Sequence, residues 1–261
     1  KSPKNCIYIW LTKRNTMKRI LYILYTWLIF VPVFLVLTLL TALVTMAGCF
    51  LGNESVFSYW PGRIWSRLTC YLALCPVTVR GREHIPAGKS CVFVSNHQGA
   101  FDIFLIYGFL GVPFKWVMKE GIGKIPFVGA ACRAAGFIFV ENKKGGGSVQ
   151  VIRKAERYLA NGTSIVIFPE GSRTYDGKMI RFRKGAYQLA ADLKLPLVPI
   201  TLNGPFEVLP IGSLNLKRHR MELIIHPPVS TEGLVPDRKG LELLADQTRQ
   251  TIASALWEKY R

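Results

Sequence analysis

The chain has 261 residues, half of them apolar, and its 34 basic and 16 acidic side chains give a formal net charge of +18. This length suits one large domain with an appendage, and the charge favours a polyanionic partner such as nucleic acid or an anionic membrane. The sequence has no zinc-finger spacing, no aromatic RNA-binding signature and no CxxC pair among its six cysteines, so it argues against nucleic acid, a structural zinc site and a disulfide scaffold.

An uncharged apolar segment runs from residue 20 to residue 53. A helix of this length is longer than a bilayer core of about 30 Å requires, yet slightly short for two full spans and a turn. One long span and a bent pair of helices that enters the membrane without crossing it both fit, and Pro32 could supply the bend. A buried helix of a soluble protein is the remaining alternative.

Basic residues flank this segment on both sides. Because positive charge prefers the cytoplasmic side, they favour a re-entrant hairpin with both ends in the cytoplasm. We therefore predict membrane-associated helices over residues 17–75, including an amphipathic helix at 55–75, in contact with anionic lipids. Met17 precedes two cations and the apolar run, as a natural start would, so residues 1–16 are interpreted as a dispensable or non-native extension.

Residues 76–261 alternate between short apolar runs and amphipathic segments. This alternation predicts an α/β domain with a mixed, largely parallel central sheet flanked by helices. The expected strands cover residues 77–81, 91–96, 115–120, 137–140, 164–168, 196–204 and 220–229. The expected helices cover residues 101–110, 129–136, 148–162, 185–194 and 237–260, with a flexible loop at 141–148.

The stretch VSNHQGAFD places His97 directly after one of these strands and Asp102 at the start of the next helix. A carboxylate there is favoured by the helix dipole, and it could accept a hydrogen bond from one imidazole nitrogen and leave the other as a base. The alternative reading is a helix-capping aspartate beside an ordinary loop histidine.

A second motif, IFPEGSRT, follows the strand at 164–168. Gly171 would let the backbone approach a ligand closely, and Arg173 can bind a phosphate through two hydrogen bonds. Glu170 could hold that arginine or a substrate hydroxyl. The alternative is a surface turn that contains an ion pair.

Together, NHQGAFD and FPEGSRT resemble the motifs of the glycerolipid acyltransferases, most closely the 1-acylglycerol-3-phosphate acyltransferases. KEGIGKIPFVGAACRAAGFIFVEN (119–142) and LVPITLNG (197–204) look like two further blocks of that family in the same order. The resemblance implies that His97 is the general base and Asp102 orients it. It also implies that Lys119, Glu170, Gly171, Ser172 and Arg173 bind the acceptor, and that LVPI helps to shape the acyl-donor side.

One position departs from the family pattern. The second block usually ends in a phosphate-binding arginine, whereas this chain has Asn142, followed by Lys143 and Lys144. A lysine supplies a point charge rather than a planar fork, so this difference leaves room for an acceptor with another head group, such as a lyso-aminolipid.

The implied reaction is transfer of an acyl group from acyl-CoA or acyl carrier protein to 1-acylglycerol-3-phosphate, giving phosphatidic acid, without metal or cofactor. The enzyme is expected at a bacterial inner membrane with its catalytic domain on the cytoplasmic face. Two other classes stay open: a lipid hydrolase, for which no GxSxG nucleophile motif is present, and a non-catalytic membrane-binding protein.

Overall fold

The computed structural model describes residues 16–140 and 147–261. The predicted extension at 1–16 and the loop at 141–148 therefore lie mostly outside the described residues. The strands are β1 (Val77–Arg80), β2 (Val92–Ser95), β3 (Phe114–Lys119), β4 (Ile138–Val140), β5 (Ser164–Ile167), β6 (Leu197–Asn203) and β7 (Met221–Ile225). The α-helices are α2 (Val31–Phe50), α3 (Glu54–Phe57), α4 (Trp60–Leu72), α5 (Phe101–Phe109), α6 (Val128–Ala134), α7 (Gly147–Ala160), α8 (Gly185–Asp192), α9 (Pro205–Val208) and α10 (Arg238–Ser254).

The strands form one sheet in the order β1-β7-β6-β2-β5-β3-β4. Every neighbouring pair is parallel except β6 and β7. The predicted mixed, largely parallel sheet flanked by helices is thus confirmed. In the parallel group the carboxyl ends of β2, β5 and β3 reach the same edge, which is where loops of α/β sheets commonly carry functional groups.

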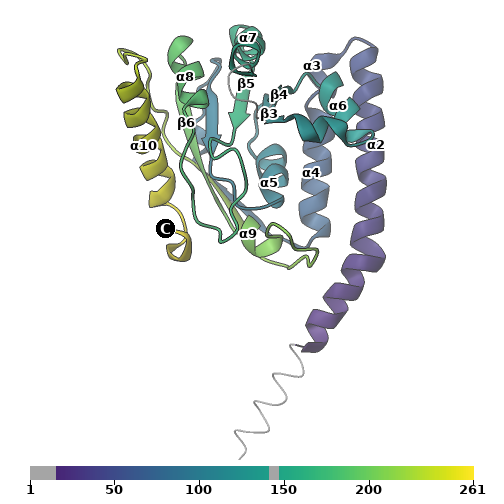
Figure 1. The fold of residues 1–261 in the computed structure, drawn as a ribbon. Coiled ribbons are helices and arrows are strands. Elements are labelled where there is room, and N and C mark those ends of the chain that lie inside the picture. Colours follow the sequence, from purple (N-terminus) through teal and green to yellow (C-terminus); the bar gives the residue numbers. More distant parts are fainter. Residues whose placement is uncertain (1–15, 141–146) are drawn as a thin grey trace, which may run out of the picture.

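Helices cover both faces of this sheet (Figure 1). Helices α7, α8 and α10 lie on one face, and α5, α4 and α2 lie on the other. Strand β2 contributes to both cores. Phe93 belongs to the apolar cluster that contains Leu105 of α5, whereas Val92 and Val94 belong to the cluster that contains Leu189 of α8 and Leu244 of α10. A strand buried on both sides needs apolar residues at every position, which explains the unbroken run CVFV.

The apolar N-terminal segment is one helix, Thr16–Phe50. Pro32 therefore does not divide this segment into two helices, the role that the sequence left open for it, and a re-entrant arrangement in a membrane stays a prediction. Residues Thr26–Phe30 instead form a π-helical turn immediately before the proline. Proline lacks an N–H group, and its ring would crowd the preceding turn of a regular α-helix. The wider π-helical turn leaves room for Pro32, so the helix continues without a break.

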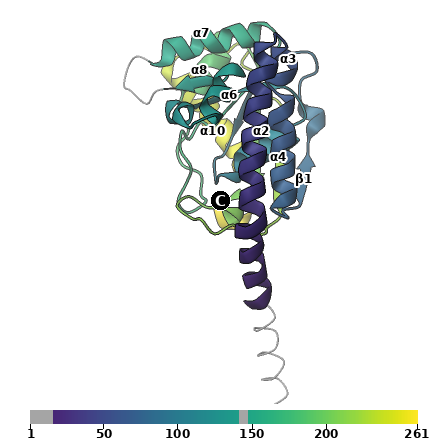
Figure 2. The same cartoon turned by 90° about the vertical axis from the view of Figure 1, so that its right-hand side faces the viewer.

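This helix packs against α4, which returns beside it (Figure 2). The hydroxyls of Tyr22 and Tyr25 donate to the carbonyls of Ala73 and Leu72, each at 2.8 Å, at the carboxyl end of α4. The reversal of the chain therefore falls after Phe50, through α3, rather than inside the apolar run. The predicted amphipathic helix at 55–75 is divided between α3 and α4, with Pro61 in the first turn of α4, where a missing N–H costs nothing.

Within the described residues, Thr16–Phe50 is long and apolar enough to cross a membrane, by length and composition. Only 17% of its most apolar window is buried in the protein, which argues against a core helix of a soluble domain. One face of α4 is also apolar and exposed at helical spacing. It is formed by Trp60, Ile64, Leu68 and Tyr71. Both helices thus expose apolar side chains outside the α/β domain.

Candidate active site

The histidine of the first motif sits at the carboxyl edge of the central strand. His97 follows β2 by two residues, and Asn96 between them continues the sheet with its side chain. The Asn96 amide donates to Leu202 O at 2.9 Å and accepts from Leu202 N at 2.8 Å. This fully buried amide replaces a pair of backbone hydrogen bonds to β6 and fixes the point where the loop leaves the sheet.

The structure brings His97 and Asp102 together. His97 Nδ1 lies 2.6 Å from Asp102 Oδ2, which also accepts a hydrogen bond from Gly99 N at 2.9 Å. Asp102 is completely buried in the first turn of α5, where the helix dipole favours a carboxylate. With Nδ1 engaged, Nε2 is the nitrogen available to a substrate, and the imidazole side chain is 16% exposed.

Helix α5 is held at its other end by two arginines. Arg67 Nε donates to Gly108 O and Arg82 donates through its guanidinium to Phe109 O, both at 2.8 Å. Cations at a helix carboxyl end satisfy free carbonyl groups and complement the dipole. The position of Asp102 is therefore set by a helix anchored to α4 and to the segment after β1.

Glu170 also supports the histidine, but it does so through the backbone. Its two carboxylate oxygens accept hydrogen bonds from His97 N at 2.7 Å and Ile180 N at 3.1 Å. Only 1% of Glu170 is exposed. Burial, with the nearby Asp102 charge, raises the pKa of Glu170 to about 7, although both N–H groups act in the opposite direction.

The predicted role of Glu170 in acceptor binding stays a prediction beside these backbone contacts. Its carboxylate joins two loops and does not pair with Arg173 within the described part of the chain. Of the two partners that the sequence suggests for Glu170, Arg173 is therefore not the one it contacts here, and a substrate hydroxyl stays a prediction. Gly171 has φ +71°, a left-handed conformation that favours glycine and directs the chain away from the strand end.

The remaining predicted residues lie at or after the carboxyl ends of β5 and β3. Ser172 and Arg173 are half-buried in the loop after β5, and Lys119 is exposed at the carboxyl end of β3. Among the described residues, neither Arg173 nor Lys119 pairs with a carboxylate. Unpaired cations at this edge of the sheet can attract an anionic group. Asn142 lies outside the described residues. The predicted donor-side stretch LVPI is part of β6, whose residues are all buried, so these four residues support the site from the core.

An aromatic stack holds the imidazole from one side, and the sequence analysis missed it. The rings of His97 and Phe168 are 4.0 Å apart at 11°, and Phe168 stacks in turn on Trp116 at 5.7 Å. Trp116 itself is buried. Phe168 is the first residue of FPEGSRT, but a phenylalanine after an apolar strand carries no sequence signal that separates a ring contact from ordinary core packing.

The loop after β5 closes back over the histidine loop. Thr174 N donates to His97 O at 3.3 Å, and Gln98 Nε2 donates to Gly177 O at 3.2 Å. The site is therefore a histidine hydrogen-bonded to a buried carboxylate and held between two loops. Such a constellation defines a class of enzymes that remove a proton from a nucleophile with a histidine.

The comparisons with known proteins agree with this class. Residues 76–203 match the model of a family described as Acyltransferase. A chloroplastic 1-acyl-sn-glycerol-3-phosphate acyltransferase from Brassica napus is 31% identical over 202 residues, which cover 77% of this chain and 56% of the relative. The alpha form of this enzyme from Homo sapiens is also 31% identical, over 189 residues, 72% of this chain and 66% of the relative.

A solved structure has the same fold. The crystal structure of the 1-acyl-sn-glycerophosphate acyltransferase PlsC from Thermotoga maritima matches with a TM-score of 0.74 at 24% identity, over 93% of this chain and 99% of that chain. Residues 76–203 form a domain that belongs to the acyltransferase family. It spans 56% and 66% of the length of the two relatives described above.

Proposed function

We propose that the protein transfers an acyl group from a thioester to the free hydroxyl of 1-acylglycerol-3-phosphate, producing phosphatidic acid. The observation that carries this proposal is the 2.6 Å contact between His97 Nδ1 and Asp102 Oδ2 at the carboxyl edge of the sheet. The printed names of the relatives support this acceptor, and the unpaired Arg173 and Lys119 supply charges suited to its phosphate.

In the proposed reaction the acyl group passes directly from the thioester to the acceptor hydroxyl through a tetrahedral intermediate, without an acyl-enzyme. His97 Nε2 accepts the proton of the acceptor hydroxyl, and the hydroxyl oxygen forms a bond to the thioester carbonyl carbon. The carbon–sulfur bond then breaks, and the proton held by His97 passes to the departing thiolate. Asp102 keeps Nδ1 protonated and stabilises the charged imidazolium between these steps.

This chemistry needs no metal or cofactor, because a base of this kind contributes about 10²–10⁴-fold and positioning of the two substrates contributes further. Both acyl-CoA and acyl carrier protein are candidate donors. The membrane helix and the basic flanks of the chain support a location on a membrane, which we take to be the bacterial inner membrane with the α/β domain on its cytoplasmic face.

The direct test uses the purified protein in detergent with acyl-CoA and 1-acylglycerol-3-phosphate. Thiol release and phosphatidic acid are measured together for the wild type and for His97→Ala. We expect both products from the wild type only, with thiol released only when the acceptor is present. Free fatty acid cut from the lipid would instead identify a hydrolase.

A variant that retains strong phosphatidic acid synthesis would remove His97 from the mechanism. Absence of thiol release and of fatty acid with both donor types would support a non-catalytic protein. Transfer to a lyso-aminolipid in preference to 1-acylglycerol-3-phosphate would change the acceptor and keep the reaction class. Equal thermal unfolding of the two proteins is the control, since His97 is partly exposed and its truncation leaves the sheet intact.

A further inference from the structure

A group of basic side chains around a tryptophan lies at the carboxyl edge of the sheet, apart from the residues of the active site. We call it the basic corner, and it consists of Lys217, Arg218, His219, Arg220, Trp257 and Arg261. The first four residues precede β7, and the last two follow α10. We propose that the basic corner binds the phosphate head groups of anionic phospholipids where the domain meets the bilayer.

The charges of the corner are largely unneutralised. Within residues 16–140 and 147–261, Lys217, Arg218, Arg220 and Arg261 form no ion pair with a carboxylate. Two neighbouring acids already have partners, since Glu222 pairs with Arg80 at 3.1 Å and Glu207 pairs with Lys259. A hollow lined by Arg220, Lys259 and Arg261 lies at the corner, and Glu258 is the acidic residue in its lining. The surface is therefore complementary to an anion.

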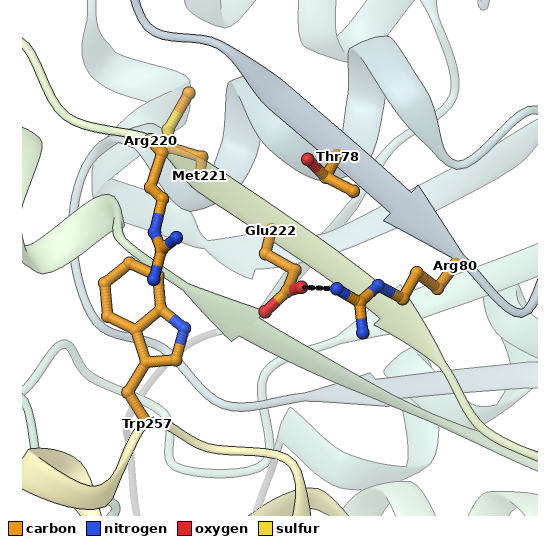
Figure 3. A pocket seen from close by; sticks show the side chains of 6 residues that line it. All are labelled: Thr78, Arg80, Arg220, Met221, Glu222 and Trp257. Atoms are coloured by element: carbon orange, nitrogen blue, oxygen red, sulfur yellow. Dashed lines mark ion pairs between the residues drawn. The ribbon is translucent and has the colours of Figure 1, made fainter.

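The arginines are held in place by the protein. The guanidinium of Arg220 lies over the indole of Trp257, with Cζ 5.2 Å from the ring centroid, in a hollow of about 310 Å³ that also contains the Arg80–Glu222 pair (Figure 3). Arg218 Nε donates to Leu74 O at 3.1 Å, and Arg261 donates to Leu256 O at 2.9 Å. Arginine on an indole next to water is a combination that suits the level of membrane head groups.

The corner adjoins the base of the apolar helix, which favours a membrane as the partner. Leu74, which accepts the hydrogen bond of Arg218, follows Ala73, which accepts that of Tyr22 in the helix Thr16–Phe50. That helix extends beyond the domain at the end of the molecule that also carries α9 and the carboxyl terminus (Figures 1 and 2). Leu214 in the same loop is 81% exposed and can enter the interface.

The corner is also connected to the active site. Tyr260 packs against Gly177 so closely that a Cβ there would lie 2.4 Å from the ring, and Gly177 O accepts from Gln98, the neighbour of His97. Binding of lipid head groups at the corner would thus fix the histidine edge close to the membrane surface. The inference rests on the proposed function only in placing the helix Thr16–Phe50 in a bilayer.

Hydrogen exchange of the full chain, reconstituted into vesicles, tests the proposal without relying on catalysis. One set of vesicles contains phosphatidylcholine alone, and the other contains equal parts of phosphatidylcholine and phosphatidylglycerol. Residues 211–220 and 255–261 should exchange about five-fold more slowly in the anionic vesicles, the factor that corresponds to one basic residue near an anionic surface. Lys217→Ser/Arg218→Ser/Arg220→Ser should abolish this difference.

Two further variants make the result specific. Arg218→Lys/Arg220→Lys keeps the charge and should keep the difference between the vesicles. Lys89→Ser/Arg153→Ser/Lys239→Ser removes three exposed cations elsewhere on the domain and should leave it unchanged. Equal exchange of the wild type in both vesicles would overturn the proposal. So would protection that appears in neutral vesicles only when acyl carrier protein is added, since that result identifies a protein-docking surface.

The same reconstituted samples separate this inference from the proposed function. Acyl transfer in neutral vesicles without any lipid-dependent protection would overturn the basic corner alone. Lipid-dependent protection without acyl transfer from either donor would overturn the proposed reaction and leave the basic corner in place.

Discussion

The carboxylate of Glu170 accepts a hydrogen bond from the backbone N–H of His97 at 2.7 Å, 73 positions earlier in the chain. The histidine motif and the glycine-arginine motif are therefore joined by the acid of the second motif. We propose that Glu170 is a positioning residue, since its carboxylate contacts His97 only through the backbone N–H. Its second oxygen holds Ile180, which ties the far end of the same loop to the histidine.

The buried carboxyl of Glu170 should make stability depend on pH. Its pKa is raised from 4.5 to about 7 in the folded protein, so the fold binds this proton more tightly than the unfolded chain does. The resulting stabilisation is complete below pH 4.5 and disappears as the pH rises through about 7. Relative to Glu170→Gln, the wild type should lose roughly 3 kcal/mol across this window.

Chemical denaturation in detergent at several pH values measures this difference. Glu232→Gln, at an exposed position, serves as the control and should show no such trend. A difference between wild type and Glu170→Gln that stays constant with pH would contradict the assignment of a raised pKa.

Replacing Asp102 by asparagine should reduce kcat by about 10²-fold or more, because an amide no longer stabilises the imidazolium formed during proton transfer. The buried side chain keeps its shape, so the KM for both substrates should change little. Steady-state kinetics with saturating donor measure both constants. Unaltered kcat in a correctly folded variant would show that the contact between Asp102 and His97 is structural only.

Phe168 should affect turnover through the orientation of the imidazole. Phe168→Leu removes the ring that stacks on His97 at 4.0 Å. We expect kcat to fall about ten-fold with little change in KM, because a misoriented imidazole slows proton transfer more than it weakens substrate binding. Phe137→Leu makes the same change in the apolar cluster that contains Trp116. If Phe168→Leu and Phe137→Leu reduce kcat by the same factor at the same loss of stability, the prediction is wrong.

Asn96 should contribute strongly to stability. Asn96→Ala leaves the buried N–H and carbonyl groups of Leu202 without partners, at a cost of about 1–3 kcal/mol for each group. Asn161→Ala removes the same side chain from an exposed turn and should be nearly neutral. Thermal unfolding of both variants measures the difference in stability. If Asn96→Ala is as stable as the wild type, another group or a water molecule replaces the amide.

Arg173 should act on acceptor binding. Arg173→Ala should raise the KM for 1-acylglycerol-3-phosphate about ten- to hundred-fold, the value expected for a lost charged hydrogen bond, and leave the KM for the donor unchanged. Arg153→Ala, on α7, is the matched control. An unchanged acceptor KM would indicate that Lys119 or the segment with Asn142 supplies the phosphate contact.

The sequence determined the class of fold because local patterns decide it. Unbroken apolar runs such as CVFV require strands buried on both faces, and alternation with amphipathic segments requires helices that cover them. The same local logic placed His97 after a strand and Asp102 in the first turn of a helix, five positions apart, which is close enough for a hydrogen bond between them. These features depend on residues only a few positions apart in the chain, so they can be read from the sequence.

The tertiary structure alone decided the partners that come from distant strands. Parallel pairing of β2 with β5 brings Phe168 onto the imidazole and Glu170 onto the backbone of His97. Sequence reasoning could list Glu170 as functional, but a single carboxylate has no pattern that tells a ligand contact from a contact between loops. The choice between one long helix and a pair bent at Pro32, which the sequence leaves open, also needed the tertiary structure. Whether Pro32 breaks the helix depends on the wider π-helical turn before it and on packing against α4. Neither can be predicted from the composition of the segment.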